Sequence, residues 1–177
     1  MSLKFTLNSF VILVAAADLL SGQGYVDPSI FRYKEKWWMF SSTGNNDVLN
    51  LYYSDHLHQG WQGHKNNPVV KLNAHSARPG GRIIFHNDKL YRMAQDGKPY
   101  YGIQIFAYEI TKLSEALYEE KLSSINPIIT KSGSGWNKTG MHHIDAQEHN
   151  GQWIAVVDGQ DDCSEFVSPS SQENDCN

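Results

Sequence analysis

The feature that most constrains this sequence is a pair of short strands around a polar turn, which occurs three times. Each copy opens with a polar cluster, runs into apolar residues, reverses at typical turn residues and returns in a strand led by an aromatic residue. The copies occupy residues 27–42, 77–96 and 141–158. The pattern predicts three β-hairpins and an all-β fold, because only one short segment, around residues 114–120, has any helical character.

The spacing of the copies indicates the architecture. The aromatic anchors Trp38, Tyr91 and Trp153 recur at intervals of roughly 50 to 60 residues, and further strand candidates lie between them. Four short antiparallel strands repeated at this length are typical of β-propeller blades. At roughly 50 residues per blade the chain holds about three, and closed propellers usually have at least four. We therefore expect a partial or open ring, whose exposed edges would call for further blades or a partner.

The segments on either side of the hairpins differ from them in composition. Residues 1–24 combine Lys4, the apolar run Phe10–Ala17 and small residues, which is typical of a signal peptide, but Asp18 interrupts the run and a buried β-strand fits equally well. Both alternatives stay open, and with them the localisation. The run is also shorter than the roughly 20 apolar residues of a membrane-spanning helix. Residues 25–159 are the expected blades.

The C-terminal segment 160–177 is acidic and contains no Lys or Arg. Its composition predicts a poorly ordered tail. Both cysteines, Cys163 and Cys176, lie in it, and the sequence does not decide whether they form a disulfide. The whole chain has a net charge of −4 and a pI near 6.0, so it lacks the broad basic surface that nucleic-acid binding requires.

Several strings within the hairpins resemble a known family. They are Tyr25–Ile30, Ala77–Arg82, Leu90–Arg92 with Gln95-Asp96 and Tyr101-Gly102, Gly135–Asn137, Met141–Asp145 and Trp153–Gly159. In this order they are similar to the propeller domain at the N-terminus of glucosamine inositolphosphorylceramide transferases, and they cover about Val11 to Gly159. The resemblance includes only the C-terminal blades of that domain.

This resemblance carries expectations about fold and function. It implies a five-bladed propeller similar to the arabinanase-like and invertase-like propellers of glycoside hydrolase family 43, in which sugar binds at the central channel. In the plant transferases, glycosyl transfer is assigned to a separate downstream domain. The resemblance therefore implies recognition of a carbohydrate or glycolipid head group more strongly than catalysis, with missing blades or a downstream glycosyltransferase domain as further partners.

The first strand of each blade lines the channel of a propeller, so the polar openings of the copies are the candidate site. Asp27 is a candidate to accept sugar hydroxyls or act as a base, or else it caps the turn before Pro28. Arg78 and Arg82 flank a Pro-Gly-Gly string and form either a fork for a carboxylate or phosphate, or structural pairs with Asp27 or Asp96. Gln95 and Asp96 end the returning strand and are candidate ligand-binding residues, with turn capping as the alternative for Asp96.

The string His142-His143-Ile144-Asp145 supplies the third set of candidates. Neighbouring residues of a strand face opposite ways, so His143 and Asp145 share one face and His142 lies on the other. His143 with Asp145 is suited to acid–base chemistry. A metal site would need a third ligand from another blade, and we predict no metal and no cofactor. Tyr101 and Trp136 are candidates to stack on a sugar ring.

Glycoside hydrolysis normally needs two carboxyl groups, one of them protonated. Asp27 and Asp145 supply one each, but no Glu opens any copy. We therefore expect a binding function through Asp27, Arg78, His143 and Asp145. The alternatives are a family 43-like hydrolase, or an inactive structural fragment that another chain completes.

Overall fold

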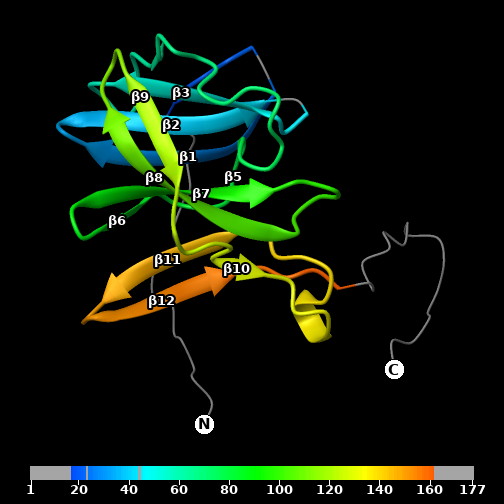
Figure 1. The fold of residues 1–177 in the computed structure, drawn as a ribbon. Helices are drawn as coiled ribbons and strands as arrows, with labels where there is room; N and C mark the ends of the chain where they lie inside the picture. Colours follow the sequence, from blue (N-terminus) through cyan, green and yellow to red (C-terminus); the bar gives the residue numbers. More distant parts are fainter. Residues whose placement is uncertain (1–16, 23, 44, 162–177) are drawn as a thin grey trace, which may run out of the picture.

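In the computed structural model, residues 17–22, 24–43 and 45–161 are described, and they are built almost entirely of β-strands. The first sheet is a four-stranded antiparallel meander of β1 (Tyr25–Tyr33), β2 (Lys36–Thr43), β3 (Val48–Ser54) and β4 (Gln62–Gly63). It forms the blue and cyan layer of Figure 1. A meander of four strands with this order is one complete propeller blade, here called blade 1.

The second sheet has the same plan with interrupted outer strands. Its strands are β5 (Arg78–Pro79), β6 (Ile84–His86), β7 (Lys89–Asp96), β8 (Gln104–Leu113), β9 (Tyr118–Leu122) and β10 (Ile129–Thr130). Both β5 and β6 pair with β7, and both β9 and β10 pair with β8. Each of these pairs of short strands therefore takes the place of one strand, and the sheet is blade 2.

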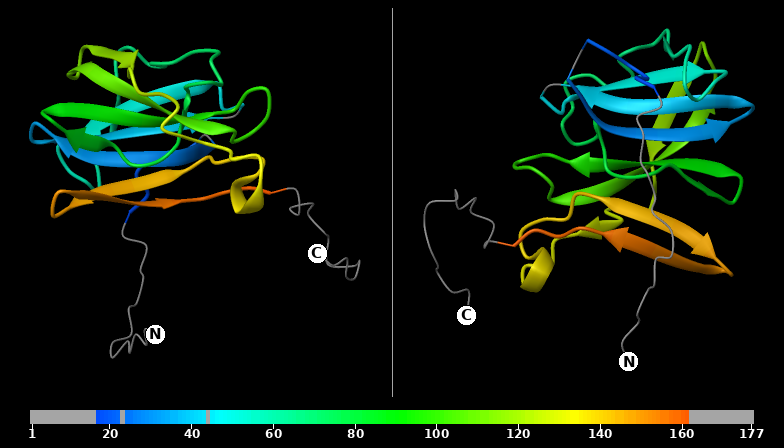
Figure 2. Two further views of the ribbon diagram at one scale, coloured as in Figure 1. Left: turned by 60° about the horizontal axis from the view of Figure 1, so that its bottom comes forward. Right: turned by 180° about the vertical axis from the view of Figure 1, so that it is seen from behind.

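The third sheet contains β11 (Ile144–His149) and β12 (Gln152–Val157) alone. These are the first two strands of a third blade, and the three sheets stack face to face in both views of Figure 2. The prediction of an all-β, partial propeller is confirmed. The described residues form two complete blades and half of a third.

The three predicted hairpins share one turn geometry. The two turn residues have positive φ in each hairpin, namely Lys34-Glu35 (47° and 64°), Asn87-Asp88 (49° and 59°) and Asn150-Gly151 (52° and 75°). This is the signature of the type I′ turn, which matches the right-handed twist of the paired strands. The turns align the blades residue by residue. Counted from the turn, Trp153 comes one residue earlier in its strand than Trp38 and Tyr91 do in theirs. Because neighbouring residues of a strand face opposite ways, Trp153 lies on the opposite face of its sheet.

An apolar core joins blades 1 and 2. Blade 1 contributes the side chains of Trp38, Phe40, Leu49 and Leu51, and blade 2 contributes Ala77, Leu90, Ile110 and Tyr118, all buried. The Phe40 and Tyr118 rings meet edge to face, with centroids 5.5 Å apart. Tyr118 comes from β9, so this core includes the outer strands of blade 2 as well as its inner ones.

A buried ion pair completes the contact between these blades. Arg92 on β7 is fully buried and donates to both carboxylate oxygens of Glu120, at 2.8 and 2.6 Å, and to the carbonyl of Ser76. Burial alone would lower the pKa of Arg92, but the neighbouring Glu120 and Tyr118 raise it above its ordinary value. Burial also raises the pKa of Tyr118 well above its ordinary value. Arg92 is therefore a structural charge, with its donors engaged inside the core.

Blades 1 and 2 also share a motif that fixes their fourth strands. Asn67 bonds through its side-chain amide to both backbone groups of Leu51, at 2.8 and 2.7 Å. Asn126 bonds in the same way to Ala107, at 2.7 and 3.1 Å. Each Asn precedes a proline and two β-branched residues, in Asn-Pro-Val-Val and Asn-Pro-Ile-Ile respectively. The amide stands in for a strand residue and satisfies backbone groups on buried parts of β3 and β8.

Several predictions fall on other parts of the chain. Residues 1–16 and 23 of the N-terminal segment, and residues 162–177 with Cys163 and Cys176, lie outside the described residues. The described part of the chain contains one short 3₁₀ helix, η1 (Gly135–Asn137). None of its helices is long and apolar enough to cross a membrane.

Candidate functional site

The first strands of the three blades meet beside a polar cleft. The Ser29 hydroxyl on β1 donates to the Gly81 carbonyl, and the Ile144 amide on β11 donates to the Gly80 carbonyl at 2.8 Å. Gly81 and Ile144 form a parallel bridge between blades 2 and 3. The cleft has a volume of about 310 Å³, and its lining residues are Asp27, Pro28, Ser29, Ile30, Gly81, Arg82, His143 and Asp145.

Glycine at position 81 is needed for this meeting of strands. Its φ is +149°, and a Cβ added there would lie 1.9 Å from the Ile144 carbonyl oxygen. No side chain fits that distance. The Pro-Gly-Gly string therefore brings the first strands of two blades together. Glycine allows the backbone to come close to a ligand or to a neighbouring strand, and here it allows the second.

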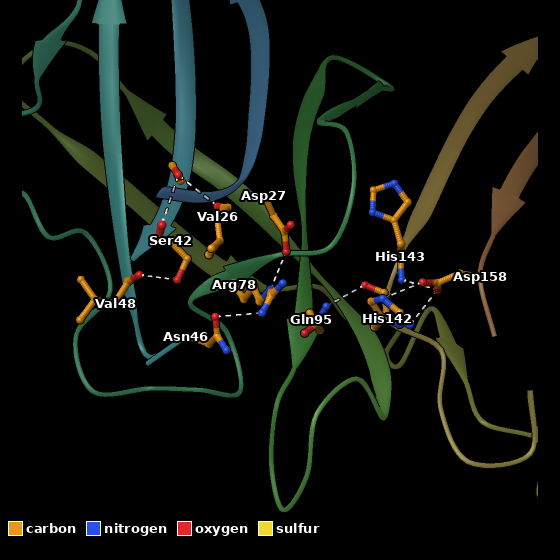
Figure 3. A network of polar contacts seen from close by, with 11 residues as sticks. Val26, Asp27, Ser42, Asn46, Val48, Arg78, Gln95, His142, His143 and Asp158 are labelled. Atoms are coloured by element: carbon orange, nitrogen blue, oxygen red, sulfur yellow. Dashed lines mark hydrogen bonds and ion pairs between the residues drawn. The ribbon is translucent and has the colours of Figure 1, made fainter. Parts of the chain in front are cut away.

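Asp27 is held in an unusual backbone conformation at the edge of the cleft. It has a φ of 48° and lies in the bulge between Val26 and Ser29. Bulges of this kind redirect a side chain. Figure 3 shows its carboxylate turned toward Arg78 of blade 2, whose Nε donates to Oδ2 at 2.5 Å.

Arg78 is engaged on three sides. Besides Asp27, its Nη1 donates to Asn46 Oδ1 at 3.0 Å, and its guanidinium lies 4.9 Å from the centroid of the Tyr101 ring. Its side chain is only 17% exposed, and it does not line the cleft. Of the two alternatives for Arg78, the geometry corresponds to the structural pair with Asp27. Tyr101 packs behind the cleft against Arg78 and lies outside the lining.

Arg82 and Asp145 form a second pair across blades, and this pair lines the cleft. The Arg82 Nη2 donates to Asp145 Oδ2 at 3.0 Å, and Arg82 Nε lies against the other carboxylate oxygen. Their side chains are 44% and 36% exposed, so both remain accessible to a ligand. The partner of Arg82 is thus Asp145, whereas the sequence offered Asp27 or Asp96.

The two histidines, which directly precede β11, point to different sides. His143 is exposed and lines the cleft with Asp145, and its ring makes no hydrogen bond within the described residues. His142 turns away, and its Nε2 lies 2.8 Å from Asp158 Oδ2. Asp158 Oδ1 also accepts from the backbone amides of both histidines, at 3.0 and 2.8 Å (Figure 3). Asp158 therefore fixes the loop that presents His143.

Gln95 lies beneath this loop. Its side chain is 1% exposed and donates through Nε2 to the His142 carbonyl at 3.1 Å. The Tyr101 ring packs against the His142 ring, with centroids 5.0 Å apart. Gln95, Tyr101 and His142 therefore support the loop, and none of the three reaches the cleft.

Asp96 and Trp136 lie elsewhere. Asp96 is 3% exposed and accepts from His75 Nδ1, Gln104 Nε2 and the Lys98 amide. The bond to the Lys98 amide is the turn cap that the sequence offered as the alternative role. Trp136, in η1, is 59% exposed and packs on the backbone of Gly159, outside the cleft lining.

Three residues of the region were not among the sequence candidates. Ser29 bridges two first strands, Asn46 holds Arg78, and Asp158 orders the histidine loop. Asn46 and Asp158 lie in segments that follow strands, where short polar side chains commonly cap backbone groups. Their sequence positions give no indication of which distant strand they contact.

The electrostatic character of the cleft is mixed. Two carboxylates, one guanidinium, one imidazole and one hydroxyl face it, and Pro28 and Ile30 add apolar surface. Within the described residues, no group of three or more His, Cys, Asp or Glu is placed to hold a metal ion. Carboxylate and hydroxyl acceptors with guanidinium and imidazole donors suit a ligand rich in hydroxyl groups.

The comparisons with known proteins agree on a family. The family described as glucosamine inositolphosphorylceramide transferase 1, N-terminal, matches residues 7–160. Glucosamine inositolphosphorylceramide transferase 1 of Oryza sativa subsp. japonica is 35% identical over 143 residues, which are 76% of this chain and 19% of the relative. The Arabidopsis thaliana protein of the same name is 32% identical over the same shares. The chain thus spans about a fifth of the length of the curated relatives that it matches.

One solved structure is similar in fold. It is a thermostable family-43 glycoside hydrolase, which matches with a TM-score of 0.51 and 14% identity over 77% of this chain and 42% of that one. At this identity the likeness supports the propeller fold alone.

Proposed function

This chain belongs to the glucosamine inositolphosphorylceramide transferase N-terminal family, and from that premise we propose that its cleft binds a sugar or the sugar-containing head group of a glycolipid. The domain is carbohydrate-related through its family and its glycosidase-like propeller fold. The observation that carries the proposal is the cleft at the junction of three first strands. It is lined by carboxylate, guanidinium, imidazole and hydroxyl groups that complement sugar hydroxyls.

Binding has better support than hydrolysis. A glycosidase needs a protonated carboxyl group beside an ionised one. Here both carboxylates of the cleft, Asp27 and Asp145, are paired with arginines, and no Glu is among the described residues that line it. Their arrangement matches two hydrogen-bond acceptors held in fixed positions better than an acid and a base.

The head group is the part of a glycolipid that fits such a cleft. The name of the relatives combines glucosamine with an inositol phosphate headgroup on ceramide, and both glucosamine and inositol are rings with many hydroxyl groups. We infer that Asp27 and Asp145 accept hydrogen bonds from ring hydroxyls. Arg82 and His143 then donate to ring oxygens or to a phosphate.

The test uses His143, because its ring has no partner within the described residues and its loss leaves the loop intact. The full chain is titrated with glucosamine, glucose, myo-inositol and inositol 1-phosphate, and binding is followed by calorimetry and by the thermal midpoint. We expect at least one compound to bind, and we expect His143→Ala to lower the affinity for that compound at least fivefold.

The matched control is His58→Ala. His58 is an exposed histidine in the β3–β4 connection, away from the cleft, and its replacement is expected to leave the affinity unchanged. The proposal is wrong if none of the four compounds binds at 10 mM, or if His58→Ala and His143→Ala weaken binding equally.

A further inference from the structure

The connecting segments at one end of the blades form a continuous surface, here called the loop face. Three segments lie at the end of the sheets where the first strands begin, namely residues 71–77, 97–103 and 131–143. The Gly97 amide donates to the Ala74 carbonyl at 2.9 Å, and the Lys131 side chain donates to the Tyr100 hydroxyl. In Figure 1, η1 and the loop after β7 mark this end on the right.

The loop face carries a surplus of positive charge. Its three segments contain no Asp or Glu and include four lysines, Lys71, Lys98, Lys131 and Lys138. Lys71 and Lys98 are exposed, and neither forms an ion pair with a carboxylate in the described part of the chain. The carboxylates of Asp96 and Asp158, at the strand ends beneath, are bound by histidines and backbone amides. In the adjoining β2–β3 loop, Asp47 is half-buried.

Lysines at the opposite end of the blades are paired instead. There the Lys36 Nζ lies 2.6 Å from an oxygen of Asp55 and 2.9 Å from one of Glu115. The Lys112 Nζ lies 2.9 Å from an oxygen of Glu119. The chain as a whole has a net charge of −4, so the unpaired lysines give the loop face a sign opposite to that of the molecule.

Large apolar side chains project from the same face. Leu72 is 86% exposed, Trp136 is 59% exposed and Tyr100 is 45% exposed. Leu72 also has a φ of 51°, which a leucine rarely adopts. The next amide, that of Asn73, donates to the Asp47 carbonyl at 3.0 Å and holds this turn. The fold therefore keeps an apolar side chain in solvent that would ordinarily be buried.

Lysines lie next to these apolar side chains. Lys71 directly precedes Leu72, and the Lys131 Nζ lies 5.1 Å from the centroid of the Tyr100 ring. Protein partners are usually met by a contiguous apolar core with a polar rim. Leucine and aromatic side chains set singly among lysines are typical of proteins that lie on a bilayer, where the rings enter the head-group region and the lysines attract anionic lipid.

We propose that the loop face docks on the surface of a bilayer that contains anionic phospholipid. Leu72, Tyr100 and Trp136 enter the head-group region, and the lysines lie against lipid phosphates. The docking does not depend on the proposed sugar site, because it uses none of the side chains that line the cleft. Asp27 and His143 of the cleft lie at the same end of the blades. If the cleft binds a glycolipid head group, this docking brings it to the membrane that carries one.

The test measures sedimentation of the full chain with sucrose-loaded vesicles. Vesicles of phosphatidylcholine with about 30% phosphatidylserine are compared with vesicles of phosphatidylcholine alone. Neither lipid contains a sugar or inositol, so the result is separate from that of the sugar titration. We expect at least tenfold stronger binding to the anionic vesicles at about 0.1 M salt, and loss of this preference at about 0.5 M salt, because salt screens the attraction.

Two double variants with the same net charge test the lysines. Each lysine near an anionic surface contributes about fivefold in affinity, so we expect Lys71→Gln with Lys98→Gln to weaken binding to the anionic vesicles at least tenfold. The matched control is Lys34→Gln with Lys112→Gln, at the opposite end of β1 and β8. We expect this control to change binding less than twofold.

The apolar side chains are tested in the same way. We expect Leu72→Ser to weaken vesicle binding at least threefold, and Leu117→Ser, in the turn after β8 at the opposite end, to leave it unchanged. Brominated lipid in the anionic vesicles should quench the tryptophan fluorescence of the parent chain, and Trp136→Phe should remove most of that quenching. Thermal melting of each variant without lipid confirms that it is folded.

Several results would overturn the proposal. They are absence of binding to the anionic vesicles, equal binding to both kinds of vesicle, or equal losses in the lysine variant and its control. Binding that persists unchanged in the lysine variant and in Leu72→Ser would belong to another segment, such as Phe10–Ala17, and not to the loop face. A dimer in light scattering that Leu72→Ser dissociates would assign the loop face to a second copy of the chain.

Discussion

The side chain of Asn126 makes the sharpest test of how the blades are held together. Its amide accepts from the Ala107 amide at 2.7 Å and donates to the Ala107 carbonyl at 3.1 Å and the Ser123 carbonyl at 2.9 Å. Ala107 is 2% exposed, so water does not readily take over these hydrogen bonds when the Asn126 side chain is removed. Asn126→Ala removes all three bonds and fills none of the space.

The expected cost follows from those contacts. A buried backbone group left without a partner costs about 1–3 kcal/mol, and two such groups belong to Ala107. Because Asn126 itself is only half-buried, some water reaches the site, and we expect a loss of about 2–4 kcal/mol in the free energy of unfolding. That is a large share of the roughly 5–15 kcal/mol that stabilises a typical domain.

Urea unfolding of the full chain, followed by tryptophan fluorescence, measures this loss as a shift in midpoint at unchanged m-value. Asn67→Ala should cost a similar amount, since it removes the same pair of bonds from Leu51. Asn66→Ala, at the exposed neighbouring residue, is the matched control and should change stability by less than about 0.5 kcal/mol. A loss below about 0.5 kcal/mol in Asn126→Ala would refute the reasoning.

Three further variants have defined outcomes. Arg92→Met leaves the Glu120 carboxylate unpaired beside the core and should destabilise the chain by about 3–5 kcal/mol in urea; an effect under 1 kcal/mol would contradict the role given to this pair. Lys34→Asn with Glu35→Gly supplies the residues that a type I′ turn prefers and should stabilise by about 1–2 kcal/mol, read as a higher melting midpoint; an unchanged midpoint would argue against strain at this turn. Gly81→Ala forces the first strands of blades 2 and 3 apart and should cost about 3 kcal/mol or more, which circular dichroism melting would detect, and a variant as stable as the parent would disprove the close contact.

The hairpins were predictable because local chemistry determines them. Turn-forming residues stand between apolar runs in all three copies, and the structure places a two-residue turn at each. The facing of Trp153 was not predictable in the same way. A shift of one residue relative to the turn moves a side chain to the other face of a strand, and the aromatic spacing alone did not show that shift.

The long-range partners of the site residues were harder to predict from the sequence. Arg78 and Asp27 are 51 positions apart, and Arg82 and Asp145 are 63 apart. The sequence allowed a structural pair for each arginine, but which carboxylate it meets depends on how neighbouring blades stack. The Asn-Pro repeat at positions 67 and 126 was visible in the sequence, and its equal placement just after β4 in blade 1 and β9 in blade 2 is the signal that identifies its role.

The pairing of charges also determines which substitutions can report on function. Asp27 binds to Arg78 of the next blade, and Arg82 binds to Asp145 of the blade after it, so each pair lines or borders the cleft and also joins two blades. Replacing either carboxylate removes a ligand acceptor and leaves an arginine without its partner, and a loss of binding would then mix the two effects. His143 contributes its ring to the cleft and its backbone amide and carbonyl to the fold, through Asp158. It is therefore the position at which loss of sugar binding can be separated from loss of the propeller.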